Sequence, residues 1–433
     1  MRFLRKSLDS DSRDLITSAG MAFALRGAGA VLAFGFNVAI GRVFGAEGTG
    51  LFFTALAMVV ILSAISRLGL DNAMLRLIAA SAAIPDWARV NGVFRIGMRS
   101  ATLASLVLAA ALLGLAAPLS ERLFDTPELT RPMQLMSLGI VTFSLMMLLS
   151  ESLKGLSRIP QAMLVSGVLW PLFGILLVWP LAQAFGPDGA SLTYVGATGA
   201  AALCGWLMWR HLRNDTPADT AVAPELWSSA RPLWAMAIIT TGLLPWAPIL
   251  LLGIWGSASE TGLLGVSTRV ANLVAFFLVA VNNVLAPRFA ALYQMDETAR
   301  IRQLARRFAL LTALAASPLL LVLIFAGDVV LALFGPEFTD GTTILAILAV
   351  GQAFNAATGS VGVLLMMTGN ERAVRNGALL AAAIVLVASV VLIPTLGAIG
   401  AAIAAAGAVI AMNLFSVFMV RRKLGFLVIP WIR

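Results

Sequence analysis

The sequence TGLLGVSTRVANLVAFFLVAVNNVL, residues 261–285, is a run of 25 residues with one charged side chain, Arg269. Crossing the hydrocarbon core of a bilayer takes roughly 20 apolar residues in a helix. No aspartate or glutamate occurs between Glu260 and Asp296, so the run itself offers Arg269 no acidic partner. The run therefore predicts a membrane helix that carries one basic side chain inside it.

The composition of the whole chain agrees with a membrane protein. Of its 433 residues 60% are hydrophobic and 12% are charged, whereas soluble domains are close to a quarter charged. The single cysteine, Cys204, excludes an internal disulfide, and the single histidine, His211, leaves no His/Cys cluster for zinc, haem or an iron–sulfur centre. We therefore expect neither a metal site nor a cofactor, and we interpret the charged N-terminal residues 1–14 as a cytoplasmic segment rather than a cleaved signal peptide.

Apolar runs of the required length recur along the chain. Each is bounded by charged residues, glycine or proline, and together they predict an all-α polytopic protein with twelve transmembrane helices. The predicted spans are 15–41, 50–70, 96–117, 132–153, 160–181, 190–209, 232–255, 261–285, 308–326, 342–368, 376–394 and 398–420.

The positions of lysine and arginine test this count, because these residues collect on cytoplasmic loops. With the N-terminus inside, 24 of the 30 basic residues fall on cytoplasmic segments. Three fall on the opposite side and three within spans. The pattern predicts cytoplasmic N- and C-termini. It also explains the basic excess by topology, so we do not expect nucleic acid as a partner.

The chain also repeats itself at an offset of about 211 residues, which predicts a duplicated fold. Two six-helix lobes would share one orientation and be related by a pseudo-twofold axis along the membrane normal. The predicted domains are an N-terminal lobe at 1–210, a cytoplasmic linker at 211–229 and a C-terminal lobe at 230–433. The matched pairs are Gly186 and Gly397, Gly189 and Gly400, Ala190 and Ala401, Phe124 and Phe334, and Gly50 and Gly262.

Three arginines lie within predicted spans, and they are the main candidates for function. All 21 acidic residues fall in loops or at span edges. An ionisable side chain inside a membrane is costly and usually faces the protein interior or a water-filled path. For Arg26 and Arg269 we favour contact with an anionic ligand over a structural hydrogen bond. For Arg67, near the cytoplasmic end of its span, we favour the structural interpretation.

Amide side chains follow the same helix faces as these arginines. Asn37 lies on a face of small residues that includes Arg26, and Asn272 lies one turn after Arg269, with Asn283 further along the span. The sequence GQAFNAATGS, with Gln352 and Asn355, marks the tenth span as another candidate wall. Prolines at positions 160, 171, 180, 245 and 248 interrupt helical hydrogen bonding in the fifth and seventh spans.

Two stretches resemble a known family. NVAIGRVFGAEGTGLFFTALAMVVILSAISRLGLDNAMLRLIA, residues 37–79, resembles the opening of polysaccharide transporters (Wzx-like flippases) of the multidrug/oligosaccharidyl-lipid/polysaccharide exporter superfamily. The span with Arg269 and the exit at Pro287 is similar to a matching helix of that family. The matching residues of the first stretch are Arg42, Phe44, Gly45, Glu47, Gly48, Gly50, Gly69 and Leu70.

The resemblance implies a flippase rather than an enzyme. Such proteins move undecaprenyl-diphosphate-linked oligosaccharides for O-antigen, capsule or exopolysaccharide to the outer leaflet by alternating access through a cationic central cavity. The resemblance assigns the pyrophosphate to Arg26 and Arg269, and it implies a bacterial inner-membrane location. It also implies membrane lipids, a polysaccharide polymerase and a chain-length regulator as partners. The candidate substrate-binding residues are Arg26, Asn37, Arg67, Arg269, Asn272, Asn283 and Asn355.

Other functions remain open at this point. A lipid II flippase of the same superfamily would share the architecture, although it would be expected to have additional helices. A multidrug cation antiporter would need an acidic residue inside the N-terminal lobe, whereas the acidic residues there lie in loops or at span edges, with Asp71 and Glu151 closest to the core. A polymerase or ligase would be expected to have a large outer loop, whereas the longest here have only about fifteen residues.

Overall fold

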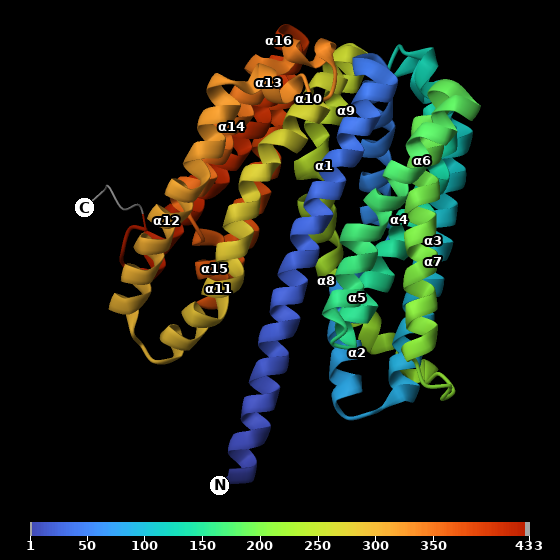
Figure 1. The fold of residues 1–433 in the computed structure, drawn as a ribbon. Coiled ribbons are helices and arrows are strands. Elements are labelled where there is room, and N and C mark those ends of the chain that lie inside the picture. The colour runs from blue at the N-terminus through green and yellow to red at the C-terminus, as the bar shows by residue number, and fades with distance from the viewer. Residues whose placement is uncertain (1, 429–433) are drawn as a thin grey trace. The chain divides into compact units, whose positions relative to one another are not determined.

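The computed structural model describes residues 2–428, with the side chains of residues 20–21, 24–279, 281–282 and 285–428. Every regular element within residues 2–428 is a helix (Figure 1). The elements are α1 (Arg2–Ser66), α2 (Leu70–Ala83), α3 (Trp87–Arg122), η1 (Pro127–Leu129), α4 (Thr130–Gly155), α5 (Ile159–Met163), η2 (Leu164–Leu169), α6 (Trp170–Phe185), η3 (Gly186–Asp188), α7 (Gly189–Leu212), η4 (Thr220–Val222), α8 (Ala223–Ala237), η5 (Ile238–Leu243), α9 (Leu244–Trp255), α10 (Ala258–Ala271), η6 (Asn272–Val274), α11 (Ala275–Gln294), α12 (Thr298–Phe325), α13 (Gly327–Leu331), η7 (Pro336–Gly341), α14 (Thr342–Thr358), α15 (Val361–Met367) and α16 (Glu371–Leu424).

The described residues form two compact units. Unit 1 comprises residues 2–43 and 58–238, and unit 2 comprises residues 44–57 and 239–428. In unit 1, α4 packs against both α3 and α7, and in unit 2, α16 packs against both α9 and α14. The units differ from the predicted ranges because segment 44–57 packs with unit 2 and residues 230–238 pack with unit 1. The predicted domains 1–210, 211–229 and 230–433 stay a prediction.

Nine helical segments among the described residues are long and apolar enough to cross a membrane. Large apolar side chains are exposed on them, as on α3, where Val107 is 67% exposed. Such surfaces suit lipid rather than water. Three of the nine segments contain a glycine with positive φ, at Gly45, Gly186 and Gly397, where the helical conformation is interrupted.

One matched pair of turns in the predicted repeat has the same backbone conformation, while the two-lobe duplication itself stays a prediction. Gly186 has φ 56° and ψ −129°, and its partner Gly397 has φ 56° and ψ −133°. A Cβ atom on Gly189 would lie 2.7 Å from the carbonyl oxygen of Leu181, and one on Gly400 would lie 2.4 Å from that of Leu392. Leu181 and Leu392 are themselves 211 residues apart, so the same residues make the same close approach in both halves.

Two predicted spans need correction. The second ends at Ser66, because Leu68 and Gly69 adopt positive φ angles, so Arg67 lies in the turn before α2 and not within the span. The tenth is broken at Gly359, whose φ of 65° ends α14 before α15 begins. A Cβ atom there would lie 2.9 Å from the backbone of Ala309. Mean hydropathy does not reveal such helix breaks, because a single glycine lowers the mean hydropathy of an apolar run only slightly.

Each π-helical turn within residues 2–428 lies close to a proline that the sequence marks as interrupting a helix. η2 lies between Pro160 and Pro171 in the fifth span, and η5 lies directly before Pro245 in the seventh. Proline removes a backbone donor and disturbs the hydrogen bonds of the preceding turn, and π-turns are a common response within helices.

The polar stretch that the sequence suggests as a linker is packed against unit 1. Asn91 on α3 donates hydrogen bonds through Nδ2 to the carbonyl oxygens of Asn214 and Thr216, at 2.9 and 2.8 Å. The backbone N–H of Asp219 donates to the carbonyl of Ala88 at 2.9 Å. Leu226, in α8, is fully buried in the core of unit 1. Hydrogen bonds to α3 and the buried Leu226 therefore fix this stretch to unit 1 near both of its ends.

Candidate functional site

The candidate site lies in unit 2, and its main helix, α10, is held at its beginning by a capping box. The Ser257 hydroxyl accepts from the N–H of Glu260 at 3.2 Å, and the Glu260 carboxylate accepts from the N–H of Ser257 at 3.0 Å. These bonds satisfy two of the backbone donors that a helix start leaves unpaired. They set the position from which α10 runs toward Arg269.

Close contact with segment 44–57 of α1 fixes α10 along its length. A Cβ atom on Gly262 would lie 2.1 Å from the carbonyl oxygen of Ala46, and one on Gly50 would lie 1.6 Å from that of Ala258. Any side chain at either glycine would separate the two backbones. Gly50 and Gly262 are the matched residues of the repeat, as are Ala46 and Ala258 at the same offset, so the crossing is symmetric.

Two turns beyond this crossing, the guanidinium of Arg269 lies close to two aromatic rings. Its Cζ atom is 4.4 Å from the ring centroid of Trp246 on α9 and 5.4 Å from that of Phe53. Both rings are buried, and Gly265 leaves room for Phe53, since a Cβ there would lie 2.2 Å from the ring. Cation–π contacts of this kind stabilise a cation in surroundings with little water.

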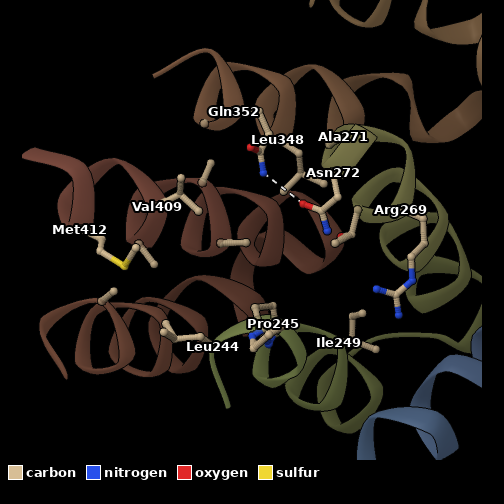
Figure 2. A pocket seen from close by; sticks show the side chains of 17 residues that line it. Leu244, Pro245, Ile249, Arg269, Ala271, Asn272, Leu348, Gln352, Val409 and Met412 are labelled. Carbon is tan, nitrogen blue, oxygen red and sulfur yellow. Dashed lines mark hydrogen bonds between the residues drawn. The ribbon is translucent and has the colours of Figure 1, made fainter. Parts of the chain in front are cut away.

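Arg269 also lines a cavity of about 330 Å³ enclosed by α9, α10, α14 and α16 (Figure 2). Its walls are mostly apolar, and Thr268, Arg269, Asn272 and Gln352 are the polar side chains among them. None of the described residues that line it is aspartate or glutamate. The Thr268 hydroxyl donates to the carbonyl of Leu264 at 2.7 Å, which leaves Arg269 and the amides to set the polarity of the cavity.

A chain of amide hydrogen bonds runs from the core of unit 2 to this cavity. Asn413 Nδ2 donates to Asn355 Oδ1 at 3.3 Å, and Asn355 Nδ2 donates to Gln352 Oε1 at 3.2 Å. Gln352 Nε2 then donates to Asn272 Oδ1 at 3.1 Å, the bond drawn as a dashed line in Figure 2. We call these four residues the amide relay.

The structure brings together three of the residues suggested by the sequence. Arg269 and Asn272 line the cavity, and Asn355 lies behind Gln352 in the relay. Asn283 lies in α11, but its side chain is outside the described part of the chain. Gln352, which the sequence marks together with Asn355 as part of a candidate wall, also lines the cavity.

The other three suggested residues lie in unit 1. Arg26 is exposed on α1. Asn37 is buried, and its Nδ2 donates to the carbonyl of Ala33 in its own helix at 2.6 Å. Arg67 is buried, with its Nε atom 3.3 Å from Asp71 Oδ1 and its Cζ atom 5.8 Å from the centroid of Phe143. Substrate contact by any of these residues stays a prediction.

Sequence reasoning missed three residues of the site. Asn413 interrupts the apolar run AVIAMNLFSVF of the last span, a signal of the same kind as Asn272. Trp246 stands between two prolines in LLPWAP, and no sequence pattern assigns its ring to an arginine that is 23 residues away. Phe53 could not be predicted because it lies in a different span from Arg269. It reaches α10 only because the backbones approach closely at Gly50 and Gly262.

No protein-family model matches the chain. The chain is similar to the probable flippase AglR of Haloferax volcanii, with 25% identity over 421 residues that cover 87% of this chain and 81% of that protein. It is also similar to the probable low-salt glycan biosynthesis flippase Agl15 of the same organism. That match has 22% identity over 281 residues, covering 63% of this chain and 57% of that protein.

Two solved structures have the same fold. The lipid II flippase MurJ in an inward closed conformation matches with a TM-score of 0.76 and 14% identity, over 92% of this chain and 87% of that one. A multidrug resistance MATE family transporter of the MOP superfamily, in an inward-facing conformation, matches with a TM-score of 0.69 and 15% identity, over 91% and 94%. The chain therefore has the fold of these two transporters, and its apolar helices support a multi-pass membrane protein.

Proposed function

We propose that the protein is a flippase that moves a lipid-linked oligosaccharide from the inner to the outer leaflet of its membrane by alternating access. The observation that carries the proposal is the cavity beside Arg269, with a cationic group at an apolar wall and no carboxylate in its described lining. A polyprenyl-diphosphate glycan has matching parts, an anionic diphosphate and an apolar chain. Similarity to the named flippases AglR and Agl15 supports the same activity.

In this proposal Arg269 binds the diphosphate. A guanidinium can make two parallel hydrogen bonds to phosphate oxygens and keeps its charge at any physiological pH. Trp246 and Phe53 both contact the guanidinium, so less conformational freedom is lost when the ligand binds. The alanine-rich wall contributed by α16 would accommodate the apolar part of the lipid.

Arg26 is the second candidate ligand. It is exposed on α1, in a span predicted from sequence. In this proposal a second basic side chain binds the diphosphate as it moves through the protein. Arg26 suits that role because its side chain is exposed. Asn37 and Arg67 have partners within unit 1, so we give them no more than a positioning role.

Two other substrates are alternatives. A lipid II flippase would share the fold of MurJ and would present the same diphosphate to Arg269. A multidrug cation antiporter would share the fold of the MATE transporter, but a cationic drug would be repelled by Arg269 in a cavity whose described lining has no acidic residue. We therefore favour a glycan lipid over a cationic drug.

We propose twelve membrane crossings with both termini cytoplasmic. The nine membrane-length segments among the described residues become twelve crossings if Gly45, Gly186 and Gly397 each end one crossing and begin the next. Cys204 is the single native cysteine, so single-cysteine labelling in a Cys204→Ser background tests this topology. Cysteines at Gly186 and Gly397 should react from outside the cell, and one at Asp215 only after permeabilisation.

For location and partners we propose the cytoplasmic membrane of a prokaryote and a role in O-antigen, capsule or exopolysaccharide synthesis. A polysaccharide polymerase and a chain-length regulator would then receive the glycan on the far side of the membrane. The support is the sequence resemblance to polysaccharide transporters together with the glycan named for one relative.

The substrate is tested by reconstituting the purified protein in liposomes with three probes. These are a fluorescent polyprenyl-diphosphate oligosaccharide, a fluorescent lipid II and a cationic dye. We expect transfer of the first probe between leaflets at a rate above that of empty liposomes. Transfer of lipid II alone would establish the first alternative, and dye uptake without lipid transfer would refute the proposed function.

A further inference from the structure

The amide relay has a direction, and a backbone carbonyl sets it. Asn413 is 5% exposed on α16, and its Nδ2 donates to the carbonyl oxygen of Val409 at 2.9 Å. A carbonyl oxygen can only accept a hydrogen bond, so the amide of Asn413 must turn its nitrogen to that side. The hydroxyl of Thr358, 2% exposed, lies 3.0 Å from Asn413 Oδ1 and 3.1 Å from the carbonyl oxygens of Phe354 and Asn355, which share its one proton. The carbonyl of Val409 therefore determines the orientation of this amide.

The same direction passes along the relay to the cavity. Because Asn413 donates to Asn355 Oδ1, the Nδ2 of Asn355 must point to Gln352 Oε1. Gln352 then has only its Nε2 to offer Asn272 Oδ1. Asn272 is left with its nitrogen on the cavity side, and Figure 2 shows that nitrogen turned away from Gln352. No residue within the described part of the chain accepts from it.

We propose that the amide relay turns the donor nitrogen of Asn272 toward the cavity beside Arg269, so that the cavity selects an anionic, phosphate-bearing amphiphile and rejects a cationic one. Arg269 and the Asn272 nitrogen are then the two donor groups that meet the phosphate oxygens. Asn413, Asn355 and Gln352 are positioning residues, because they hold Asn272 in one of its two amide orientations. This inference rests on the proposed function and deepens it by naming what sets the specificity.

The relay can be reversed from a distance. An ionised carboxylate only accepts hydrogen bonds, so in Asn413→Asp the neighbouring Asn355 must turn its nitrogen toward position 413. Gln352 then donates to Asn355, and Asn272 donates to Gln352. Asn272 would present its oxygen to the cavity, next to Arg269, although the substitution itself lies three residues away in the relay.

The test measures binding of farnesyl diphosphate to the purified full-length protein in detergent by titration calorimetry. Farnesol and dodecyltrimethylammonium serve as the neutral and cationic probes, at a pH where the new carboxyl is ionised. We expect Asn413→Asp to weaken farnesyl diphosphate binding by about ten- to a hundredfold, the usual range for a hydrogen bond to a charged group. Asn355→Asp leads to the same reversal and serves if the first variant does not fold.

Asn413→Leu tests whether the direction of the hydrogen bonds in the amide relay matters. Unlike Asn413→Asp, it removes the residue that fixes the direction without reversing it. Without a fixed donor at position 413, the remaining amides can adopt both orientations. If the two are equally populated, the competent fraction is half and binding weakens by about twofold. A purely structural role predicts instead that the leucine and aspartate variants lose binding in proportion to their loss of thermal stability.

Two further variants complete the design. Ser416→Asp places the same charge one turn along α16, where the native hydroxyl donates to the carbonyl of Met412 at 2.8 Å, outside the relay. Its affinity should match the wild type. In an Asn272→Ala background, Asn413→Asp should have no additional effect, because the group through which it acts is gone.

The outcomes separate the two proposals. If the wild type binds farnesyl diphosphate and Asn413→Asp binds it equally well, the relay inference is wrong and the proposed function stands. The same holds if Ser416→Asp loses as much affinity as Asn413→Asp. If the wild type binds the cationic probe and not farnesyl diphosphate, the proposed function fails and the relay inference fails with it.

Discussion

Arg67 and Arg269 are both cations in apolar stretches of sequence, and the structure treats them differently. Arg67 is 6% exposed, within ion-pair distance of Asp71 and 5.8 Å from the ring of Phe143. Its contact with Asp71 is electrostatic, since it lacks the geometry of a hydrogen bond. Arg269 contacts two aromatic rings and lines a cavity whose described lining has no acidic residue. The comparison teaches that an arginine beside its own carboxylate stabilises the fold, whereas one at an acid-free cavity can bind a ligand.

The largest expected effect comes from reversing the charge at the cavity. Arg269→Glu places a carboxylate where we propose a diphosphate, so repulsion adds to the lost hydrogen bonds. We expect farnesyl diphosphate binding to fall by more than about a hundredfold, with calorimetry as the measurement. Arg269→Gln, which removes the charge without reversing it, is the matched control and should lose less. Equal binding by both variants and the wild type would place the ligand elsewhere.

The aromatic contacts on Arg269 give the next effect. Trp246→Ala removes the nearer ring, and cation–π contacts contribute about 0.5–2 kcal/mol. We expect an affinity loss of about 2- to 30-fold, with Trp246→Phe between this variant and the wild type. If the phenylalanine variant binds no better than the alanine variant, an aromatic ring at this position does not contribute to the affinity.

A smaller effect is expected from moving the second ring. In Gly265→Ala the new methyl group would lie 2.2 Å from the present position of Phe53, so the ring must shift. Overpacking of this kind costs about 1–3 kcal/mol of stability, and we expect only about a two- to fivefold loss of affinity. Adding Phe53→Leu should recover the melting temperature without recovering the affinity. Recovery of both would show that Phe53 does not position Arg269.

The smallest effect on binding should come from Arg67. Arg67→Ala leaves Asp71 without its partner, and we expect a loss of about 1–3 kcal/mol because the pair is only partly buried. The double variant Arg67→Met with Asp71→Leu removes both charges and should regain most of that stability. Thermal unfolding measures the first effect, and calorimetry should find the affinity of the double variant unchanged. Loss of binding in the stable double variant would make Arg67 a ligand and break the comparison.

Much of the fold could be predicted because it depends on patterns that a chain displays locally. Apolar length and basic loops indicate membrane helices, and the repeat led to Gly186 and Gly397, which share one turn conformation. Gly359 was missed because a single glycine does not break an apolar run, although its positive φ ends α14. The end of the second span at Ser66 was missed for a similar reason.

The candidate site was predictable only in part. Arg269 and Asn272 stand out as polar residues in an apolar run, and Asp71, four residues after Arg67, is a partner that the sequence itself displays. Trp246, Phe53 and Asn413 come from three other helices, and their roles depend on packing. The direction of the amide relay depends on one carbonyl, that of Val409, and no sequence pattern specifies that contact.

The most direct test of the central claim is glycan export in cells that lack their own flippase, at matched membrane abundance of each variant. Arg269→Ala and Arg269→Lys are compared with the Arg67→Met and Asp71→Leu double variant. We expect no export with alanine, partial export with lysine, which keeps the charge without the paired donors, and near-normal export with the double variant. Normal export by Arg269→Ala would contradict the account and reduce Arg269 to a structural residue.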